Sequence, residues 1–284
     1  SAFMACGAYG LGMTSQYFGV GMWWGILIGL ALVIILGLLV GIPTLRLRAD
    51  YLAIVTIATA EIVRLVVRSV RFKEYFGGSD GINSFSTSFR DLSPFDPAGQ
   101  YGIRPFKYSG YSLWTMIVGW SLVIIFSALV YMLMKSPWGR VVKAIREDED
   151  AVRSLGKNVY SYKMQSLIIG GLLGTLAGIV FVLPRAVQPG NYGTGLTFFI
   201  WTILLLGGAS TVLGPIIGSM IFWVLLSLTE GLLSAGVSSG VVTFIQQDQI
   251  GGIRFMLVGL GLMLLVIFRP QGIFGNKKEL YFNA

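Results

Sequence analysis

Long stretches of apolar residues without charge recur along the chain, separated by shorter polar segments. They cover residues 20–41, 111–134 and 164–184, and a longer one runs over 186–229. About 20 apolar residues at a helical rise of about 1.5 Å each span the hydrocarbon core of a bilayer, so the longest stretch can cross twice. Helix breakers and charges predict about eight crossings, at 2–18, 20–41, 51–70, 111–134, 163–184, 196–209, 213–235 and 251–268. The pattern therefore predicts an all-α, polytopic transmembrane helical bundle that forms a single domain over residues 1–284.

The composition agrees with this prediction and excludes other classes of protein. Of the 284 residues, 55% are apolar and 12% are charged, against about 25% charged in an ordinary soluble domain. The net charge of +8 does not indicate a nucleic-acid binder, because the basic residues are divided between apolar stretches rather than gathered in one patch. Cys6 is the single cysteine and histidine is absent, which leaves no Cys/His metal site and no Cys/His or Ser/His catalytic pair. We therefore expect a chain that is not an enzyme and binds no metal.

Lysine and arginine fall unevenly on the two sides of the predicted membrane. Cytoplasmic loops are enriched in these residues, and one side carries twelve of them against six on the other. This assigns an external loop to 71–110, a cytoplasmic loop to 136–158 and a cytoplasmic carboxy-terminal tail to 269–284. The cytoplasmic group is Arg46, Arg48, Lys135, Arg140, Lys143, Arg146, Arg153, Lys157, Lys163, Arg269, Lys277 and Lys278, and the external group is Arg71, Lys73, Arg90, Arg104, Lys107 and Arg185.

Glycines inside the predicted crossings have two interpretations. Small residues four positions apart let membrane helices approach closely, as in Gly25-xxx-Gly29, Gly170-xxx-Gly174-xxx-Gly178 and Gly214-xxx-Gly218. The alternative is that some of them interrupt a helical hairpin near a transport pathway, since broken helices line such pathways in transporters. That reading applies to Gly207, Gly208, Gly214 and Pro215.

Residues 136–158 have the signals of an amphipathic helix at the membrane surface. Ser136 suits an N-cap, Pro137 suits the first helical position, and Gly156 lies where a helix would stop. Apolar residues recur at helical spacing among many charges, at Val141, Ala144, Ile145, Val152 and Leu155. The pattern fits a helix held by anionic lipid headgroups and a helix docked on a partner equally well.

A second candidate site lies within a predicted crossing. Glu61 follows Asp50 by 11 residues, or roughly 16 Å of helix, which places it near the middle of the membrane. Arg64 is three residues further along, on the same helix face, and can pair with Glu61. Charges at this depth are costly and find partners or face a cavity. Glu61 and Arg64 are therefore either a structural ion pair or part of a translocation path.

Several motifs resemble the LivM-type permeases of branched-chain amino acid ABC transporters, and together they span nearly the whole chain. Residues 139–156 are similar to that family's cytoplasmic loop, in which Asp150-Ala-Val followed by Gly156 keeps the spacing of the Glu-Ala-Ala loop of ABC importers. The departures are Asp150 in place of Glu and the start of the chain at Ser1, within an apolar run, which leads us to expect upstream residues. Further similar motifs are Leu45-Arg-Leu-Arg-Ala-Asp-Tyr-Leu-Ala-Ile-Val-Thr56, Glu61-Ile-Val-Arg64, Gly77-Gly-Ser-Asp-Gly-Ile82, Leu206-Gly-Gly208, Leu213-Gly-Pro215 and Arg269-Pro-Gln-Gly-Ile-Phe274.

The resemblance implies a function for residues 139–156 as a coupling helix that docks on a cytoplasmic ATPase. The chain has no Gly-x-x-x-x-Gly-Lys-Ser/Thr loop, so ATP and Mg would be used by that partner, and this chain would bind no cofactor. We expect Arg146, Glu147 and Asp148 to make polar contacts with the ATPase while Val141 and Ile145 seat the helix. The other members of this candidate interface are Gly139, Asp150, Ala151 and Gly156.

The resemblance also implies the remaining partners and the location. The expected assembly is an importer in the bacterial plasma (inner) membrane, with a second, LivH-like permease, two LivG/LivF-like ATPases, an external substrate-binding protein and surrounding lipid. In the external loop, Gly77, Gly78, Asp80 and Gly81 are candidates for the face that receives the binding protein or for the mouth of the path. Branched-chain amino acids are the expected cargo. The alternatives are urea or a short amide carried by the same machinery, an ion-coupled secondary transporter, and a structural scaffold.

Overall fold

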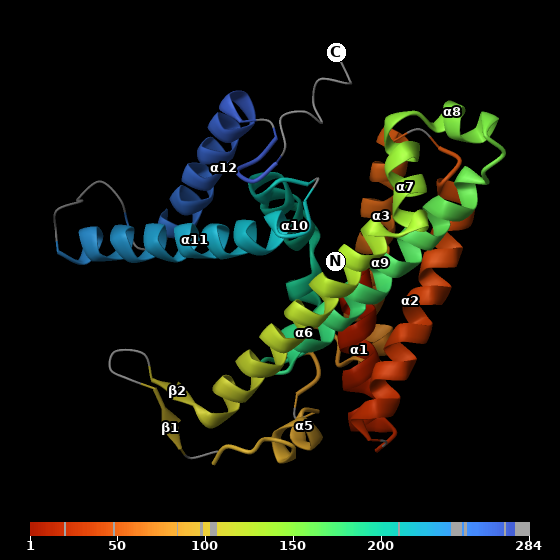
Figure 1. Ribbon diagram of the computed structural model, residues 1–284. Coiled ribbons are helices and arrows are strands. Elements are labelled where there is room, and N and C mark those ends of the chain that lie inside the picture. Colours follow the sequence, from red (N-terminus) through yellow and green to blue (C-terminus); the bar gives the residue numbers. More distant parts are fainter. Residues whose placement is uncertain are drawn as a thin grey trace. The chain divides into compact units, whose positions relative to one another are not determined.

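The computed structural model describes residues 1–19, 21–47, 49–83, 85–96, 99–102, 107–209, 211–239, 246, 249–269 and 271–275. Each predicted crossing coincides with one long helix, with bounds that differ by a few residues (Figure 1). These helices are α1 (Ala2–Tyr17), α2 (Met22–Thr44), α3 (Ala49–Arg68), α6 (Gly110–Lys135), α9 (Val159–Val182), α10 (Thr194–Gly207), α11 (Gly214–Ser238) and α12 (Ile250–Phe268). The all-α prediction is confirmed in its main features.

Not every long helix has the length and hydropathy of a membrane span. Within the described residues, α2, α6, α9 and α11 are long and apolar enough to cross, whereas α10 and the apolar part of α12 are shorter. α3 carries acidic and basic side chains that lower its hydropathy. The structure therefore supports a multi-pass membrane protein, and the number of eight crossings stays a prediction.

Shorter elements connect the long helices. Between α3 and α6 lie η1 (Val70–Phe72), α4 (Lys73–Phe76), α5 (Thr87–Asp91), β1 (Gln100–Tyr101) and β2 (Tyr108–Ser109). β1 and β2 form an antiparallel pair with Gln100 opposite Ser109, which the sequence pattern did not predict. The other short elements are α7 (Pro137–Glu147), α8 (Glu149–Ser154) and η2 (Pro189–Tyr192).

The chain divides into two compact units, and the first, Ser1–Thr197, is built around α1, α2 and α9. These helices lie side by side in Figure 1. A Cβ added at Gly10 would lie 2.7 Å from Cα of Gly29, so the Gly25-xxx-Gly29 motif does bring α1 and α2 into close contact. Thr175 of α9 is fully buried and donates a hydrogen bond to the carbonyl of Phe3, at 3.1 Å. The three helices therefore form one tightly packed bundle.

The second unit is Phe198–Ala284, and its described part contains most of α10, with α11 and α12. Its small core consists of Leu206, Phe222 and Leu226. Arg254 of α12 forms an ion pair with Glu230 of α11, which joins the two helices by charge as well as by apolar contact. The prediction of one functional domain over the whole chain stays a prediction.

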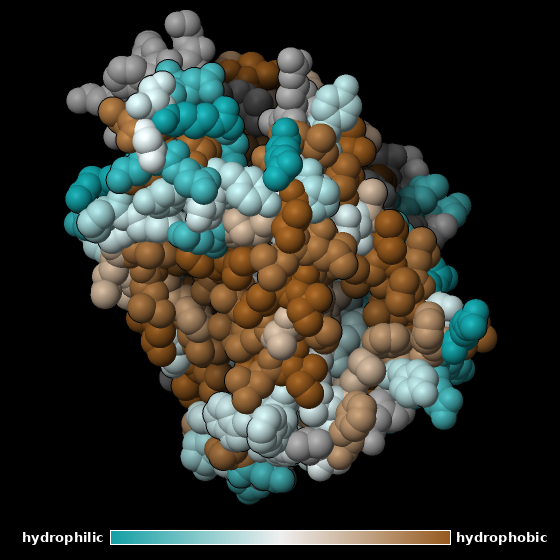
Figure 2. All heavy atoms as spheres, turned by 90° about the vertical axis from the view of Figure 1, so that its right-hand side faces the viewer, coloured by the Kyte–Doolittle hydropathy of each residue, from teal (hydrophilic) through white to brown (hydrophobic). Residues whose placement is uncertain are grey.

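The first unit has a broad apolar surface of the kind that faces lipid. In Figure 2 a broad hydrophobic band covers the face to which α2 contributes, and hydrophilic residues gather at both of its ends. No residue of the apolar window of α6 is buried within the chain. In a bilayer, outward apolar side chains need no partner from the protein. The exposed apolar side chains of α2 are Trp23, Trp24, Leu27, Ile28, Leu32, Ile34, Ile35, Leu38, Leu39 and Ile42.

Candidate functional site

α7 and α8 (the α7–α8 segment, residues 136–158) connect two apolar helices, α6 and α9. Ser136 caps α7 by accepting a hydrogen bond from the amide of Gly139, at 3.3 Å, and Pro137 stands in the first turn. Gly139 is buried, and a Cβ there would lie 2.5 Å from Cα of Met134. The end of α6 and the start of α7 therefore meet at a tight corner, in which Gly139 has a structural role.

The segment consists of two helices rather than one continuous helix. Asp148 has extended backbone angles between them and caps α8, accepting hydrogen bonds from the amides of Asp150 and Ala151 at 3.0 Å each. Gly156 follows α8 with φ +75°. The signal for this break is present in the sequence, because an Asp followed by acidic residues in the next turn is a typical helix start.

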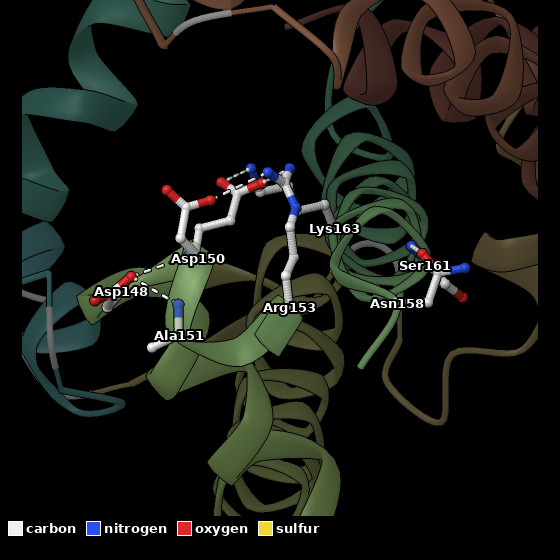
Figure 3. A network of polar contacts seen from close by, with 8 residues as sticks. Asp148, Asp150, Ala151, Arg153, Asn158, Ser161 and Lys163 are labelled. Atoms are coloured by element: carbon white, nitrogen blue, oxygen red, sulfur yellow. Dashed lines mark hydrogen bonds and ion pairs between the residues drawn. The ribbon is translucent and has the colours of Figure 1, made fainter. Parts of the chain in front are cut away.

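An ion-pair cluster attaches α8 to α9. The carboxylate of Glu149 accepts from Arg153 at 2.6 Å and also pairs with Lys163 of α9. In Figure 3 the side chains of Asp150, Arg153 and Lys163 turn toward one another, and Lys163 comes from the neighbouring helix. Val152, on the same helix as Glu149, is buried, with 5% of its surface exposed. Glu149 and Lys163 were not among the predicted site residues, because a pair 14 residues apart leaves no local pattern.

A separate hydrogen bond attaches α7 to the same part of α9. The indole Nε1 of Trp138 donates to Oε1 of Gln165 at 2.7 Å. Both α7 and α8 thus contact the first turns of α9 through polar side chains.

The predicted interface residues lie on different faces of the α7–α8 segment. Val141 and Ile145 are half-buried, and Gly139 is buried. The exposed residues of the set are Arg146, Glu147, Asp148, Asp150, Ala151 and Gly156. The segment therefore presents a largely charged surface, which also includes the exposed side chain of Leu155. The role of that surface stays a prediction.

Glu61 and Arg64 form an ion pair within α3. Nε of Arg64 donates to Oε2 of Glu61 at 2.9 Å, and a second contact joins the other guanidinium nitrogen to Oε1. Arg64 retains 18% and Glu61 34% of their side-chain exposure. Arg64 also lies beside Gly193, which follows η2. The pair is neutral as a unit, which lowers its cost in an apolar environment.

Removing one member of this pair is expected to destabilise the protein more than removing both. Glu61→Gln leaves the Arg64 cation without its carboxylate, and we expect the unfolding temperature to fall by about 2–4 °C. The double variant Glu61→Gln/Arg64→Gln should recover part of this loss, because no uncompensated charge remains. Thermal unfolding of the single and double variants in detergent measures the coupling. Strictly additive losses would contradict a paired role.

The glycine-rich corner at 77–81 connects two distant parts of the first unit. Gly77, Gly78 and Gly81 have positive φ, and Ile82 forms a β-bridge with Val187 after α9. Asp80 accepts a hydrogen bond from Lys73 at 2.7 Å, which lowers the pKa of the Asp80 carboxyl and raises that of Lys73. Because the Lys73 contact lowers the pKa of the Asp80 carboxyl, the pair stabilises the folded protein at neutral pH. This stabilisation is lost as the pH falls through the lowered pKa of Asp80. The docking role stays a prediction.

The break between α10 and α11 is occupied by the segment after α12. α10 ends at Gly207, Gly208 has φ +107°, and Pro215 stands in the first turn of α11. The amides of Ile273 and Phe274 donate to the carbonyls of Leu206 and Gly207, at 2.9 and 3.1 Å. Residues 271–275 therefore cap the end of α10, while the proposed proximity of this break to a transport path stays a prediction. Lys277 and Lys278 of the predicted tail lie outside the described residues.

Comparisons with known proteins cover almost the whole chain. Residues 1–268 match the family model described as branched-chain amino acid transport system / permease component. The high-affinity branched-chain amino acid transport system permease protein LivM of Escherichia coli is 29% identical over 282 residues, and LivM of Salmonella typhimurium is 30% identical. Each alignment covers 95% of this chain and 61% of the relative, so the chain spans about three fifths of their length. A probable LivM of Methanocaldococcus jannaschii is 25% identical over 91% of this chain and 70% of its own length. No solved structure matches.

Proposed function

Because the chain belongs to the family of permease components of branched-chain amino acid transport systems, we propose that it is the transmembrane permease subunit of an ATP-driven importer for these amino acids. The observation that carries this proposal is the family match over residues 1–268. The apolar helices are suited to form part of a translocation path by alternating access. The chain itself would perform no covalent chemistry.

The α7–α8 segment is the surface on which a partner ATPase would dock. It lies between two apolar helices, Val141 and Ile145 are half-buried, and most of its charged residues are exposed. A docked ATPase would contact Arg146 and Glu147. ATP and Mg would be bound by that ATPase and not by this chain. Asp148 is less suited to such a contact, because its carboxylate already caps α8.

The remaining partners follow from the same proposal. A second, LivH-like permease would complete the path, two LivG/LivF-like ATPases would supply energy, and an external binding protein would deliver the amino acid near the corner at 77–81. This arrangement places the α7–α8 segment and the carboxy terminus on the cytoplasmic side of the bacterial inner membrane. Glu61 and Arg64 would then lie in or beside the path.

Uptake of radiolabelled leucine into proteoliposomes tests the proposal. The chain would be reconstituted with its neighbouring subunits, with and without ATP, and with urea as a competing cargo. ATP-dependent leucine uptake is the expected result. ATP-dependent uptake of urea but not leucine would show that the cargo is urea. Uptake driven by an ion gradient without ATP would contradict the ATP-driven mechanism.

Charge reversal at Glu147 tests the docking surface. Glu147 is exposed, and its carboxylate lies 4.0 Å from the guanidinium of Arg146, which is also exposed. Such a surface contact contributes little to stability, so Glu147→Lys should leave the α7–α8 segment folded while altering its charge. We expect weaker co-purification of the ATPase, by about fivefold at most, since a single exposed charge contributes about 0.2–1 kcal/mol. Glu74→Lys is the matched control, because Glu74 is an exposed glutamate of α4 and should retain the ATPase. Equal retention by both variants would count against docking at Glu147.

A further inference from the structure

We propose that Lys163 is a positioning residue. Its ion pair with Glu149 transmits displacement of the α7–α8 segment to α9, and α9 passes this displacement on to α1 and α2, on which it packs. This inference rests on the proposed function, in which a motor protein moves that segment. It concerns how the motion enters the membrane helices.

The contact between α8 and α9 is concentrated in a few side chains. Glu149 holds Arg153 of its own helix with one carboxylate oxygen and Lys163 of α9 with the other. Lys163 and Glu149 are each about two thirds covered, with 33% and 32% of their side chains exposed, so water screens this pair less than a fully exposed one. Val152 of α8 is buried, with 5% of its surface exposed. Lys163 is therefore the charged group through which α9 holds α8.

A second polar contact reaches α9 within the next turn. Trp138 of α7 donates to Gln165, two residues beyond Lys163. The two contacts fix both helices of the segment to one short stretch of α9. A displacement of the segment then moves the start of α9 with it, as long as both contacts persist.

α9 is the helix through which such motion can reach the bundle. Met164, next to Lys163, is buried, and a Cβ added at Gly41 of α2 would lie 2.8 Å from its sulfur. Further along, Thr175 bonds to the carbonyl of Phe3 in α1. α6, in contrast, has no buried residue in its apolar window. Motion of α9 therefore displaces closely packed neighbours, whereas α6 packs on the core of the first unit through Tyr111, Trp114 and Val118, near the end of the helix away from α7.

The test compares three lysine variants in the reconstituted complex. Lys163→Gln removes the cation, Lys163→Arg retains it, and Lys135→Gln removes a lysine at the end of α6 that contacts Tyr131 rather than α8. We expect Lys163→Gln to lower leucine uptake per ATP hydrolysed by about threefold to fivefold, the shift that a partly exposed ion pair produces. ATP hydrolysis and the amount of assembled complex should remain, and Lys163→Arg and Lys135→Gln should both couple normally.

The outcomes separate this inference from the proposed function. If the unmodified complex shows no ATP-dependent uptake, the proposed function fails before any variant is compared. If it transports leucine and Lys163→Gln leaves the ratio of uptake to hydrolysis unchanged, the inference is overturned. A loss of assembled complex in Lys163→Gln that Lys163→Arg does not restore would also overturn it, because Lys163 would then act in folding by its shape rather than in transmission by its charge.

Discussion

Replacement of Gly178 by alanine should separate α1 from α9 and destabilise the first unit. A Cβ at this position would lie 2.1 Å from the carbonyl oxygen and 2.6 Å from Cα of Met4. Both atoms belong to the backbone of α1, so no side-chain rotation can relieve the overlap and the helices must move apart. Overpacking typically costs about 1–3 kcal/mol, and we expect the upper end of this range. Thermal unfolding in detergent should begin about 6–12 °C lower, at about 2–4 °C for each kcal/mol.

Gly170 supplies the matched control for this prediction. It lies on the same helix and belongs to the same Gly-xxx-Gly-xxx-Gly motif, but no atom lies within 4 Å of an added Cβ. Gly170→Ala should therefore leave the unfolding temperature unchanged or raise it slightly, since alanine favours a helix over glycine. Equal losses in the two variants would contradict the prediction, because a loss at Gly170 cannot come from contact with α1.

These two glycines show what the sequence could and could not predict. Their spacing indicates a helix surface suited to close packing, and α9 does pack closely on α1. The spacing does not reveal which glycine meets the partner, because that depends on the rotation of α9 against α1. Contacts between Gly178 and Met4, which are 174 residues apart in the chain, leave no trace in the local pattern.

The α7–α8 segment shows the same division between local and distant information. Ser136, Pro137 and Gly156 define its ends by local chemistry, and the structure places them as predicted. The break at Asp148 was missed because the apolar positions keep a helical spacing through it. The attachment to Lys163 and Gln165 depends on how α8 folds back on α9, which no periodicity encodes.

The number of membrane crossings is the part of the fold that the sequence predicts least firmly. α2, α6, α9 and α11 have enough uncharged apolar residues that length alone identifies them. α3 has the length, at 20 residues, but carries Glu61, Arg64 and Arg68. Whether such a helix can lie in the membrane depends on whether its charged side chains pair with one another. Glu61 and Arg64 do form a pair, but pairing is a property of the folded chain.

Replacement of Gly272 by alanine should release the cap at the end of α10. Gly272 has φ +79°, where a Cβ costs about 1–2 kcal/mol, and the added atom would lie 2.5 Å from the carbonyl oxygen of Leu205. Relief of this overlap requires residues 271–275 to leave α10, which breaks the hydrogen bonds from Ile273 and Phe274. Each freed carbonyl adds about 0.5–1.5 kcal/mol.

Hydrogen exchange measures this effect directly. In the unmodified chain the amides of Ile273 and Phe274 should be protected from exchange, because they donate to the carbonyls of Leu206 and Gly207. In Gly272→Ala they should exchange at least about tenfold faster. A loss of about 1.4 kcal/mol of stability corresponds to a factor of ten in the opening equilibrium. Gly261→Ala in α12 is the control, because no atom lies within 4 Å of its added Cβ. Protection that survives in Gly272→Ala would mean that the cap tolerates a side chain there. Protection lost in both variants would place its origin in α12 rather than in the contact with α10.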